Sequence, residues 1–198
     1  MNINGIFPTP VVFFNLDRPL TEKENNFLLN QETHSNTGNT ISKNKNILDE
    51  DVNKNLKTFI KISINKYFEK IVKPKYKVTP YITQSWINYT KEGEFHHKHE
   101  HPNSFISGVF YIKADKQKDK IHFFNNLYRQ LKLPTDNYDA WNSDSWWFSV
   151  ETGQLILFPS SLTHMVEPVK GDTRISLSFN TFLKGHIGNA EESTGLNL

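Results

Sequence analysis

The chain has 198 residues, of which 36% are hydrophobic and 13% aromatic, and its formal net charge is +2. That length supports one domain with a core of its own and is short for two. The near-neutral charge disfavours a nucleic-acid partner or an anionic membrane surface, and the absence of cysteine excludes disulfides, iron–sulfur clusters, zinc–thiolate sites and cysteine nucleophiles.

The N-terminal segment predicts an edge strand. Residues 6–15 alternate weakly between apolar and polar side chains, and Pro8 and Pro10 favour an edge because proline cannot donate to a central ladder. The segment lacks the basic region and long apolar run of a signal peptide, and no later run is long enough to cross a membrane. We therefore expect a soluble, cytoplasmic protein.

Two helices are expected to follow. Residues 20–31 begin with Thr21 and Glu24 at the spacing of a capping box, which predicts a short helix. The polar, turn-rich residues 33–47 predict a loop. Residues 48–72 carry apolar side chains three and four positions apart, which predicts an amphipathic helix ending before a proline.

After residue 77 the pattern changes to short β-branched or aromatic segments separated by turn signals. This spacing favours a sandwich or barrel of about eight strands over alternating strands and helices. Residues 126–131 could form a short helix, and the four aromatic residues at 141 and 146–148 could form core, a lid or a substrate wall. We expect a single domain over 1–198, divided into an N-terminal strand with supporting helices (1–77), a jelly-roll core (78–184) and a loose tail (185–198).

Four of the eight histidines lie within six residues, in FHHKHEHP. Histidine is a common ligand of iron, zinc and copper. In an extended strand His97, His99 and His101 share one face, whereas His96 lies on the other together with Lys98 and Glu100. Two histidines at i and i+2 can ligate one metal, and the residues alone allow either the 97/99 or the 99/101 pair.

A third ligand and an anion site are expected near the C-terminus. His164 follows an apolar strand, and Arg174 comes ten residues later, on the next strand. A hairpin would place these two side by side, with Arg174, Ser176, Ser178 and Asn180 on a face that lines a cavity. The chain has only three arginines, at 18, 129 and 174, so each indicates a need for a planar two-pronged donor. An arginine inside a barrel needs an anionic partner.

The segments IFPTPVVFF, HEHPNSFISGVFYI and GQLILFPSSLTHMVEPVKGDTRISLSFN resemble a family of 2OG-Fe(II) oxygenases found in bacteria and marine phages. The resemblance implies a mainly β fold with N-terminal helices, built on a double-stranded β-helix (a cupin-like jelly-roll barrel). It implies that His99 and His164 are metal ligands and that Arg174 and Ser176 bind the far carboxylate of 2-oxoglutarate. Tyr111 matches a tyrosine that reaches the same carboxylate, and Asn88, like Trp86, lies where the wider superfamily places cosubstrate contacts.

One position departs from the superfamily. The usual Asp or Glu two residues after the first histidine is replaced by His101, while Glu100 is expected to face away. The implied centre has three histidines, as in some cupin dioxygenases, in place of two histidines and one carboxylate. The family pattern, not physics, selects His101 over His97, which is left near the substrate entrance or behind the ligands.

The resemblance implies the cofactors Fe(II), 2-oxoglutarate and O2, and hydroxylation of an unidentified small-molecule or peptidyl substrate in a bacterial or phage-infected cell. No nucleic acid or membrane is expected as a partner, and the sequence is compatible with a homodimer. The main alternative is a cupin-like metal protein that does not use 2-oxoglutarate, which would not need Arg174 in the cavity. A barrel that has lost catalysis is a third hypothesis, which the complete ligand set disfavours.

Overall fold

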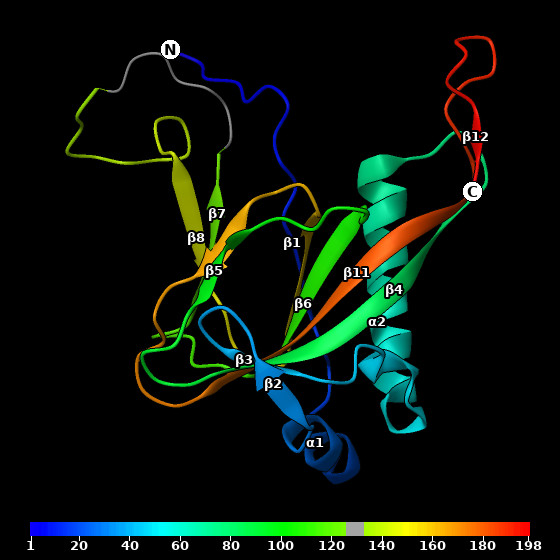
Figure 1. Ribbon diagram of the computed structural model, residues 1–198. Coiled ribbons are helices and arrows are strands. Elements are labelled where there is room, and N and C mark those ends of the chain that lie inside the picture. Colours follow the sequence, from blue (N-terminus) through cyan, green and yellow to red (C-terminus); the bar gives the residue numbers. More distant parts are fainter. Residues whose placement is uncertain (126–132) are drawn as a thin grey trace.

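The computed structural model describes residues 1–125 and 133–198 and is mainly β (Figure 1). No helix in these two ranges is long and apolar enough to cross a membrane. The helical elements are α1 (Glu22–Leu29), two 3-10 turns (Ile47–Asp49 and Asp51–Asn53), α2 (Lys54–Tyr67) and a π-helical turn (Phe68–Val72). The strands are β1 (Val12–Asn15), β2 (Thr33–Ser35), β3 (Thr40–Ser42), β4 (Val78–Thr90), β5 (His96–His99), β6 (Ile106–Lys113), β7 (Lys120–Phe124), β8 (Ser145–Ser149), β9 (Gln154–Pro159), β10 (His164–Val166), β11 (Arg174–Ile187) and β12 (Leu196–Asn197).

The strands form two antiparallel sheets. The larger follows the order β1-β9-β6-β11-β4-β3-β2, with β12 added to β11, and the smaller follows β5-β10-β7-β8. Of the eight strands from β4 to β11, four lie side by side in the larger sheet (β9, β6, β11 and β4) and the other four form the smaller sheet. Side chains from β6, β7 and β9 pack between the two sheets in one buried cluster. This arrangement confirms the predicted double-stranded β-helix.

The helices support the larger sheet, as predicted. The capping box at the start of α1 is present: the hydroxyl of Thr21 accepts from the Glu24 amide, and the Glu24 carboxylate accepts from the Thr21 amide. The apolar stripe of α2 packs on the larger sheet, with Leu56, Ile60 and Ile64 in the main core (Figure 1). Burying such a stripe is what stabilises an amphipathic helix.

Arg18 shows the two-pronged pairing that the scarcity of arginine suggested. Its two terminal nitrogens donate to the two carboxylate oxygens of Glu24, at 2.7 and 2.6 Å. Glu24 is 2% exposed and Arg18 is 32% exposed, so the pair lies at the edge of the core. Arg129 lies outside the described residues, as does the helix predicted over 126–131.

Three expectations need correction. The predicted loop over 33–47 contains the hairpin of β2 and β3, whose polar residues pair beside β4. The strand predicted over 6–15 begins only at Val12, after the two prolines, and forms β1 at the edge of the larger sheet. The tail expected to be loose continues β11 to Ile187 and folds back as β12, which pairs with the end of β11.

Candidate functional site

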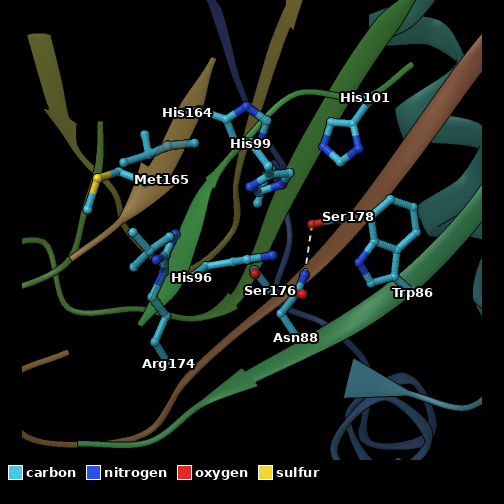
Figure 2. A pocket seen from close by; sticks show the side chains of 13 residues that line it. Trp86, Asn88, His96, His99, His101, His164, Met165, Arg174, Ser176 and Ser178 are labelled. Atoms are coloured by element: carbon cyan, nitrogen blue, oxygen red, sulfur yellow. Dashed lines mark hydrogen bonds between the residues drawn. The ribbon is translucent and has the colours of Figure 1, made fainter. Parts of the chain in front are cut away.

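A pocket lies between the two sheets, at the end where β5 and β10 face β4 and β11 (Figure 2). Histidines contribute one side of it, and β4 and β11 contribute the other. Its lining consists of Trp86, Asn88, His96, His99, His101, Val109, Ile121, His164, Met165, Val166, Arg174, Ser176 and Ser178.

Three of the predicted ligands come together here. One ring nitrogen from each of His99, His101 and His164 lies within 4.8 Å of the others. His99 and His164 face each other across the pairing of β5 with β10. In each of these two rings Nδ1 donates to a backbone carbonyl two residues earlier, at 2.7 Å for His99 and 3.0 Å for His164. These bonds fix the tautomer and leave Nε2 with a free lone pair for a metal.

His101 lies beyond the end of β5 and is held by the other sheet. Its backbone amide donates to the carbonyl of Ser160 at 3.0 Å. Its Nδ1 lies 3.4 Å from the side-chain amide of Asn180, which is on β11. The indole of Trp86 packs against the ring, with 5.9 Å between centroids. Each of the three histidines is thus positioned by its own neighbours.

The predicted alternation of faces in the histidine segment is wrong. The pairing of His164 with His99 and of Val166 with His96 contains a bulge, which gives β5 one residue more than β10. A bulge breaks the two-residue alternation, so His96 lines the pocket and His97 does not. Nothing in the spacing of the histidines marks this bulge, and sequence reasoning therefore missed His96 as a pocket residue.

Burial keeps these imidazoles neutral. Loss of solvent, and then the neighbouring histidines, lowers the pKa of His101 to about 4. The same causes lower the pKa of His164 to about 3 and that of His96 to about 2. Burial is also the main cause that lowers the pKa of His99. A neutral imidazole is the form that donates a lone pair to a metal.

Glu100 does not line the pocket, in agreement with the sequence prediction. Its carboxylate accepts a hydrogen bond from the hydroxyl of Thr163. Neither of the two groups of potential metal ligands found in the described residues contains a carboxylate. The donor set around the pocket is therefore made of imidazoles alone.

Arg174 closes the other end of the pocket. Its side chain is 3% exposed and one terminal nitrogen donates to the hydroxyl of Tyr111 at 3.3 Å. Its Nε is buried without a hydrogen-bond partner, and no carboxylate lies within ion-pair distance of it, in the part of the chain that the structure describes. A buried guanidinium without a counterion is costly, which indicates a site for an anion.

Polar residues of β4 and β11 flank Arg174. Ser176 pairs with Asn88 across the two strands and with Tyr111 on the other side. The Asn88 amide donates to Ser178 at 2.9 Å, while its oxygen is buried without a partner among the described residues. As predicted, Arg174, Ser176 and Ser178 line the cavity.

The route by which Arg174 reaches the site differs from the prediction. His164 and Arg174 are not neighbours in a hairpin, because β10 belongs to the smaller sheet and β11 to the larger one. The chain crosses between the sheets after β10, so the two residues lie on facing walls of the pocket. The ten-residue spacing therefore reflects a crossover between sheets.

The aromatic residues after position 140 do not line the pocket. Trp141, Trp146 and Trp147 are 56%, 44% and 47% exposed. Phe148 packs on the core, with its ring 5.1 Å from that of Phe13 and 6.2 Å from that of Phe123. Of the alternatives considered for these residues, core packing thus applies to Phe148.

A protein-family model matches the part of the chain that builds the pocket. Residues 84–180 match the model of a family described as "Putative 2OG-Fe(II) oxygenase". The match begins in β4 and ends in β11, so it contains every pocket residue named above. No curated protein matches the sequence significantly.

Solved structures show the same fold at low sequence identity. A prolyl hydroxylase of Trichoplax adhaerens, in complex with a hypoxia inducible factor peptide, is 14% identical with a TM-score of 0.55, over 87% of this chain and 83% of that one. A Pseudomonas putida prolyl-4-hydroxylase is 13% identical with a TM-score of 0.55, over 87% and 92%. HygX of Streptomyces hygroscopicus, with nickel and 2-oxoglutarate bound, is 8% identical with a TM-score of 0.58, over 87% and 82%.

The family match and the fold agree with each other and with the geometry of the pocket. Imidazoles on one wall offer metal ligands, and a buried arginine on the facing wall offers an anion site. An enzyme of this family requires Fe(II), 2-oxoglutarate and O2. Residues 84–180, which contain the whole pocket lining, match the 2OG-Fe(II) oxygenase family.

Proposed function

We propose that this enzyme is a hydroxylase in which His99, His101 and His164 hold Fe(II) and Arg174 binds the far carboxylate of 2-oxoglutarate. Tyr111, Ser176 and Asn88 complete the site for that carboxylate. Bound iron, with 2-oxoglutarate as the source of two electrons, supplies the activation of O2 that oxidises the substrate.

The histidines fit a divalent metal. Imidazole nitrogen is an accepted ligand of iron, and the three rings are buried or half-buried and neutral. In His99 and His164 a backbone carbonyl accepts from Nδ1 and leaves Nε2 free. Metal-binding histidines commonly have such a hydrogen bond on the nitrogen that does not bind the metal. With three neutral ligands the ion keeps its full double positive charge. The pocket would therefore contain the positive charge of the metal ion as well as that of the Arg174 guanidinium, and both favour binding of a dianion.

The observation that carries the proposal is the state of Arg174. A buried guanidinium that donates to one tyrosine hydroxyl has donors left over, including its unpartnered Nε. Arginine binds a carboxylate through two parallel hydrogen bonds, which lysine cannot reproduce. The unpartnered oxygen of Asn88 remains for a hydroxyl or water beside that carboxylate. A metal-binding barrel without 2-oxoglutarate would have no use for this buried cation.

The apolar residues of the lining have a separate role. Val109, Ile121 and Val166 contribute apolar side chains to the lining of the pocket, and apolar side chains offer water no hydrogen bonds. Excluding water strengthens the hydrogen bonds of Arg174 with an anion. It also limits side reactions of a reactive centre.

For the substrate, we infer a small molecule or a peptidyl side chain, taken up without nucleic acid or membrane as a partner. The net charge of +2 supports a non-nucleic-acid substrate. Two of the structures with this fold are prolyl hydroxylases, so hydroxylation of peptidyl proline is the first reaction to assay. Mass spectrometry of a proline-containing peptide library would detect the gain of one oxygen atom.

The cosubstrate assignment is tested by calorimetric titration of 2-oxoglutarate into anaerobic protein loaded with Mn(II). Hydrogen bonds to a charged group contribute about 1.5–3 kcal/mol each, and a tenfold change in affinity corresponds to about 1.4 kcal/mol. Arg174→Ala should therefore weaken 2-oxoglutarate by about ten- to a hundredfold, and Arg174→Lys should fall between. Binding of Mn(II) itself should be nearly unchanged.

Arg18→Lys is a matched control, because Arg18 pairs with Glu24 and neither residue lines the pocket, so this variant should bind 2-oxoglutarate like the wild type. Equal affinity in wild type and Arg174→Ala would remove Arg174 as the anchor. No binding to wild type at millimolar concentration would contradict the cosubstrate assignment as a whole.

A further inference from the structure

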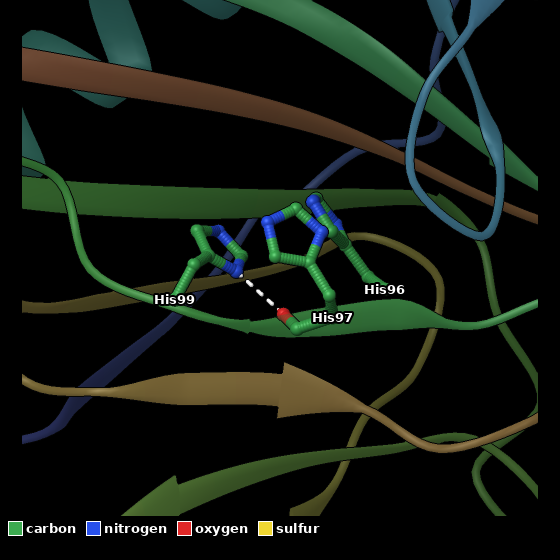
Figure 3. A group of neighbouring side chains, drawn as sticks. All are labelled: His96, His97 and His99. Carbon is green, nitrogen blue, oxygen red and sulfur yellow. Dashed lines mark hydrogen bonds between the residues drawn. The ribbon is translucent and has the colours of Figure 1, made fainter.

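A second group of three histidines adjoins the proposed iron ligands. One ring nitrogen from each of His96, His97 and His99 lies within 4.8 Å of the others (Figure 3). His99 belongs to this group and also to the group with His101 and His164. The proposed iron site does not use His96 or His97, so the cluster needs an explanation of its own.

The bulge in β5 creates this cluster. In a regular strand His96 would point away from His97 and His99, but the extra residue brings all three rings to one side of the strand (Figure 3). The ring of His96 stacks on that of His99 at 4.5 Å and 21°, and the ring of His97 lies 4.8 Å from that of His99. Bulges re-aim side chains in this way and are frequent beside active sites.

One buried nitrogen of the cluster has no hydrogen-bond partner among the described residues. Nδ1 of His97 is buried and has no hydrogen-bond partner in the part of the chain that the structure describes. The cluster contains no carboxylate, and its three imidazole donors are of the type that late first-row divalent ions prefer. Ligand nitrogens around a tetrahedral ion with bonds of about 2.0–2.1 Å lie about 3.3 Å apart, so the three rings must move closer and the ring of His96 or His99 must rotate out of their stack for an ion to bind.

We propose that His96, His97 and His99 form a second site for a divalent ion such as Co(II), Zn(II) or Cu(II), and that this site competes with the iron site for His99. The Nδ1 atom of His99 donates to the carbonyl of His97 at 2.7 Å, so only its Nε2 can coordinate. One ring nitrogen binds one ion, and the two sites are therefore occupied one at a time.

Competition for His99 has a functional consequence. An ion at the second site leaves only His101 and His164 for iron, so it removes one of the three proposed ligands. Affinity for nitrogen ligands rises from Fe(II) to Co(II), Ni(II) and Cu(II), so such ions bind three imidazoles more tightly than iron does, at the second site as at the iron site itself. The second site is thus an inhibitory site for such ions.

The test is titration of Co(II) alone, followed by its visible absorption and by calorimetry. The double variant His101→Ala/His164→Ala removes the iron site and should still bind one Co(II) per chain. His96→Ala/His97→Ala should also bind one, at the iron site. The variant with all four substitutions should bind Co(II) at least about a hundredfold more weakly than either, since a single remaining imidazole is a poor site. Wild type should bind one Co(II), not two.

The histidines outside both clusters provide the control. His34 is exposed on β2, and the ring of His186 bonds to Asn197, so His34→Ala and His186→Ala should bind Co(II) like wild type. If the alanine pair at 101 and 164 does not fold by circular dichroism, His101→Gln/His164→Gln keeps polar groups in both places and serves instead.

Two results would overturn the inference: Co(II) binding by the 101/164 variant no tighter than by the fourfold variant, or two ions bound to wild type at once. Neither result would contradict the proposed oxygenase function, because the measurement involves no 2-oxoglutarate and no turnover. Failure of His96→Ala/His97→Ala to bind Co(II) would instead contradict the proposed iron site.

Discussion

The side-chain amide of Asn180 lies 3.4 Å from Nδ1 of His101, which stands where the superfamily usually has a carboxylate. Asn180 also contacts the hydroxyl of Ser107, which in turn bonds to Ser160. In the structure the amide nitrogen of Asn180 faces Nδ1 of His101, and its oxygen accepts from the Ser107 hydroxyl. Since amide oxygen and nitrogen are assigned from such networks, the reversed amide fits the same neighbours, with Nδ1–H of His101 donating to the amide oxygen and the amide nitrogen donating to Ser107. That arrangement leaves Nε2 of His101 free to bind metal.

Asn180 should therefore affect metal affinity without being a ligand. Replacing a partner of a metal-bound histidine typically weakens the metal by about 10–100-fold, so Asn180→Ala should lose this much affinity for Mn(II) or Co(II). Asn180→Asp, which keeps an acceptor for Nδ1–H, should retain it. Competition with a chromophoric chelator measures the affinity, and Asn26→Ala, on the exposed side of α1, is the control. An unchanged affinity in Asn180→Ala would show that the contact does not orient His101.

His101 itself is expected to be replaceable by a carboxylate. His101→Asp restores the common set of two histidines and one carboxylate and should keep stoichiometric Fe(II) binding. His101→Ala removes a ligand and should weaken Fe(II) by more than about a hundredfold, beyond the effect of losing an outer partner. Anaerobic equilibrium dialysis with Fe(II) distinguishes them. Full affinity in His101→Ala would mean that His101 is not a ligand.

The core beneath the site leaves no room at Gly108. A Cβ atom at this position would lie 2.2 Å from the ring of Phe179, which is fully buried on β11. Gly108→Ala forces the ring or the strands apart, and overpacking of this kind costs about 1–3 kcal/mol. Urea denaturation should show that loss of unfolding free energy, whereas Gly5→Ala, whose added Cβ would meet only ordinary contacts at 3.6 Å, should be nearly neutral. Equal stability of the two variants would contradict the tight packing.

The pair of Arg18 and Glu24 should make stability depend on pH. The hydrogen bonds that the Glu24 carboxylate accepts from Arg18, and then those with Thr21, hold the pKa of Glu24 below its ordinary value. A depressed carboxyl pKa stabilises the fold above the ordinary value of about 4.3, and the stabilisation is lost as pH falls through the lower, folded value. Glu24→Gln should cost about 1–2 kcal/mol at pH 7, the size of a lost helix cap, and the difference from wild type should shrink below about pH 4.

Denaturation of both proteins between pH 7 and pH 3 measures this effect. Glu32→Gln is the control, because Glu32 pairs with Lys43 on the surface and is 83% exposed, and surface pairs contribute little. A constant difference between Glu24→Gln and wild type across this range would exclude the carboxylate as its cause.

Local patterns predict much of the fold because each is a direct consequence of one local rule. The capping residues Thr21 and Glu24 set the start of α1, and the apolar stripe sets α2. The alternation from Arg174 to Ser178 predicts which side chains of β11 enter the pocket, since one face must pack on the core, whereas Asn180, predicted on the same face, does not line the pocket. The hairpin of β2 and β3 is not predictable in this way, because its polar residues form strands only by pairing with β4.

The site is predictable as a set of residues but not as a geometry. The histidine spacing cannot show the bulge that turns His96 into the pocket, because a bulge depends on how β5 pairs with β10. Nor can the spacing of His164 and Arg174 show that they lie on different sheets, because a hairpin and a crossover can have the same length. The contact of Asn180 with His101 likewise depends on the larger sheet facing the smaller one.

The central claim is that one pocket holds iron on three histidines and 2-oxoglutarate on Arg174. Anomalous scattering at the iron edge, from crystals grown without oxygen in the presence of Fe(II) and 2-oxoglutarate, tests it most directly. We predict a single iron peak bounded by His99, His101 and His164, with 2-oxoglutarate density that ends at Arg174. An iron peak among His96, His97 and His99, or 2-oxoglutarate density that does not reach Arg174, would contradict the claim.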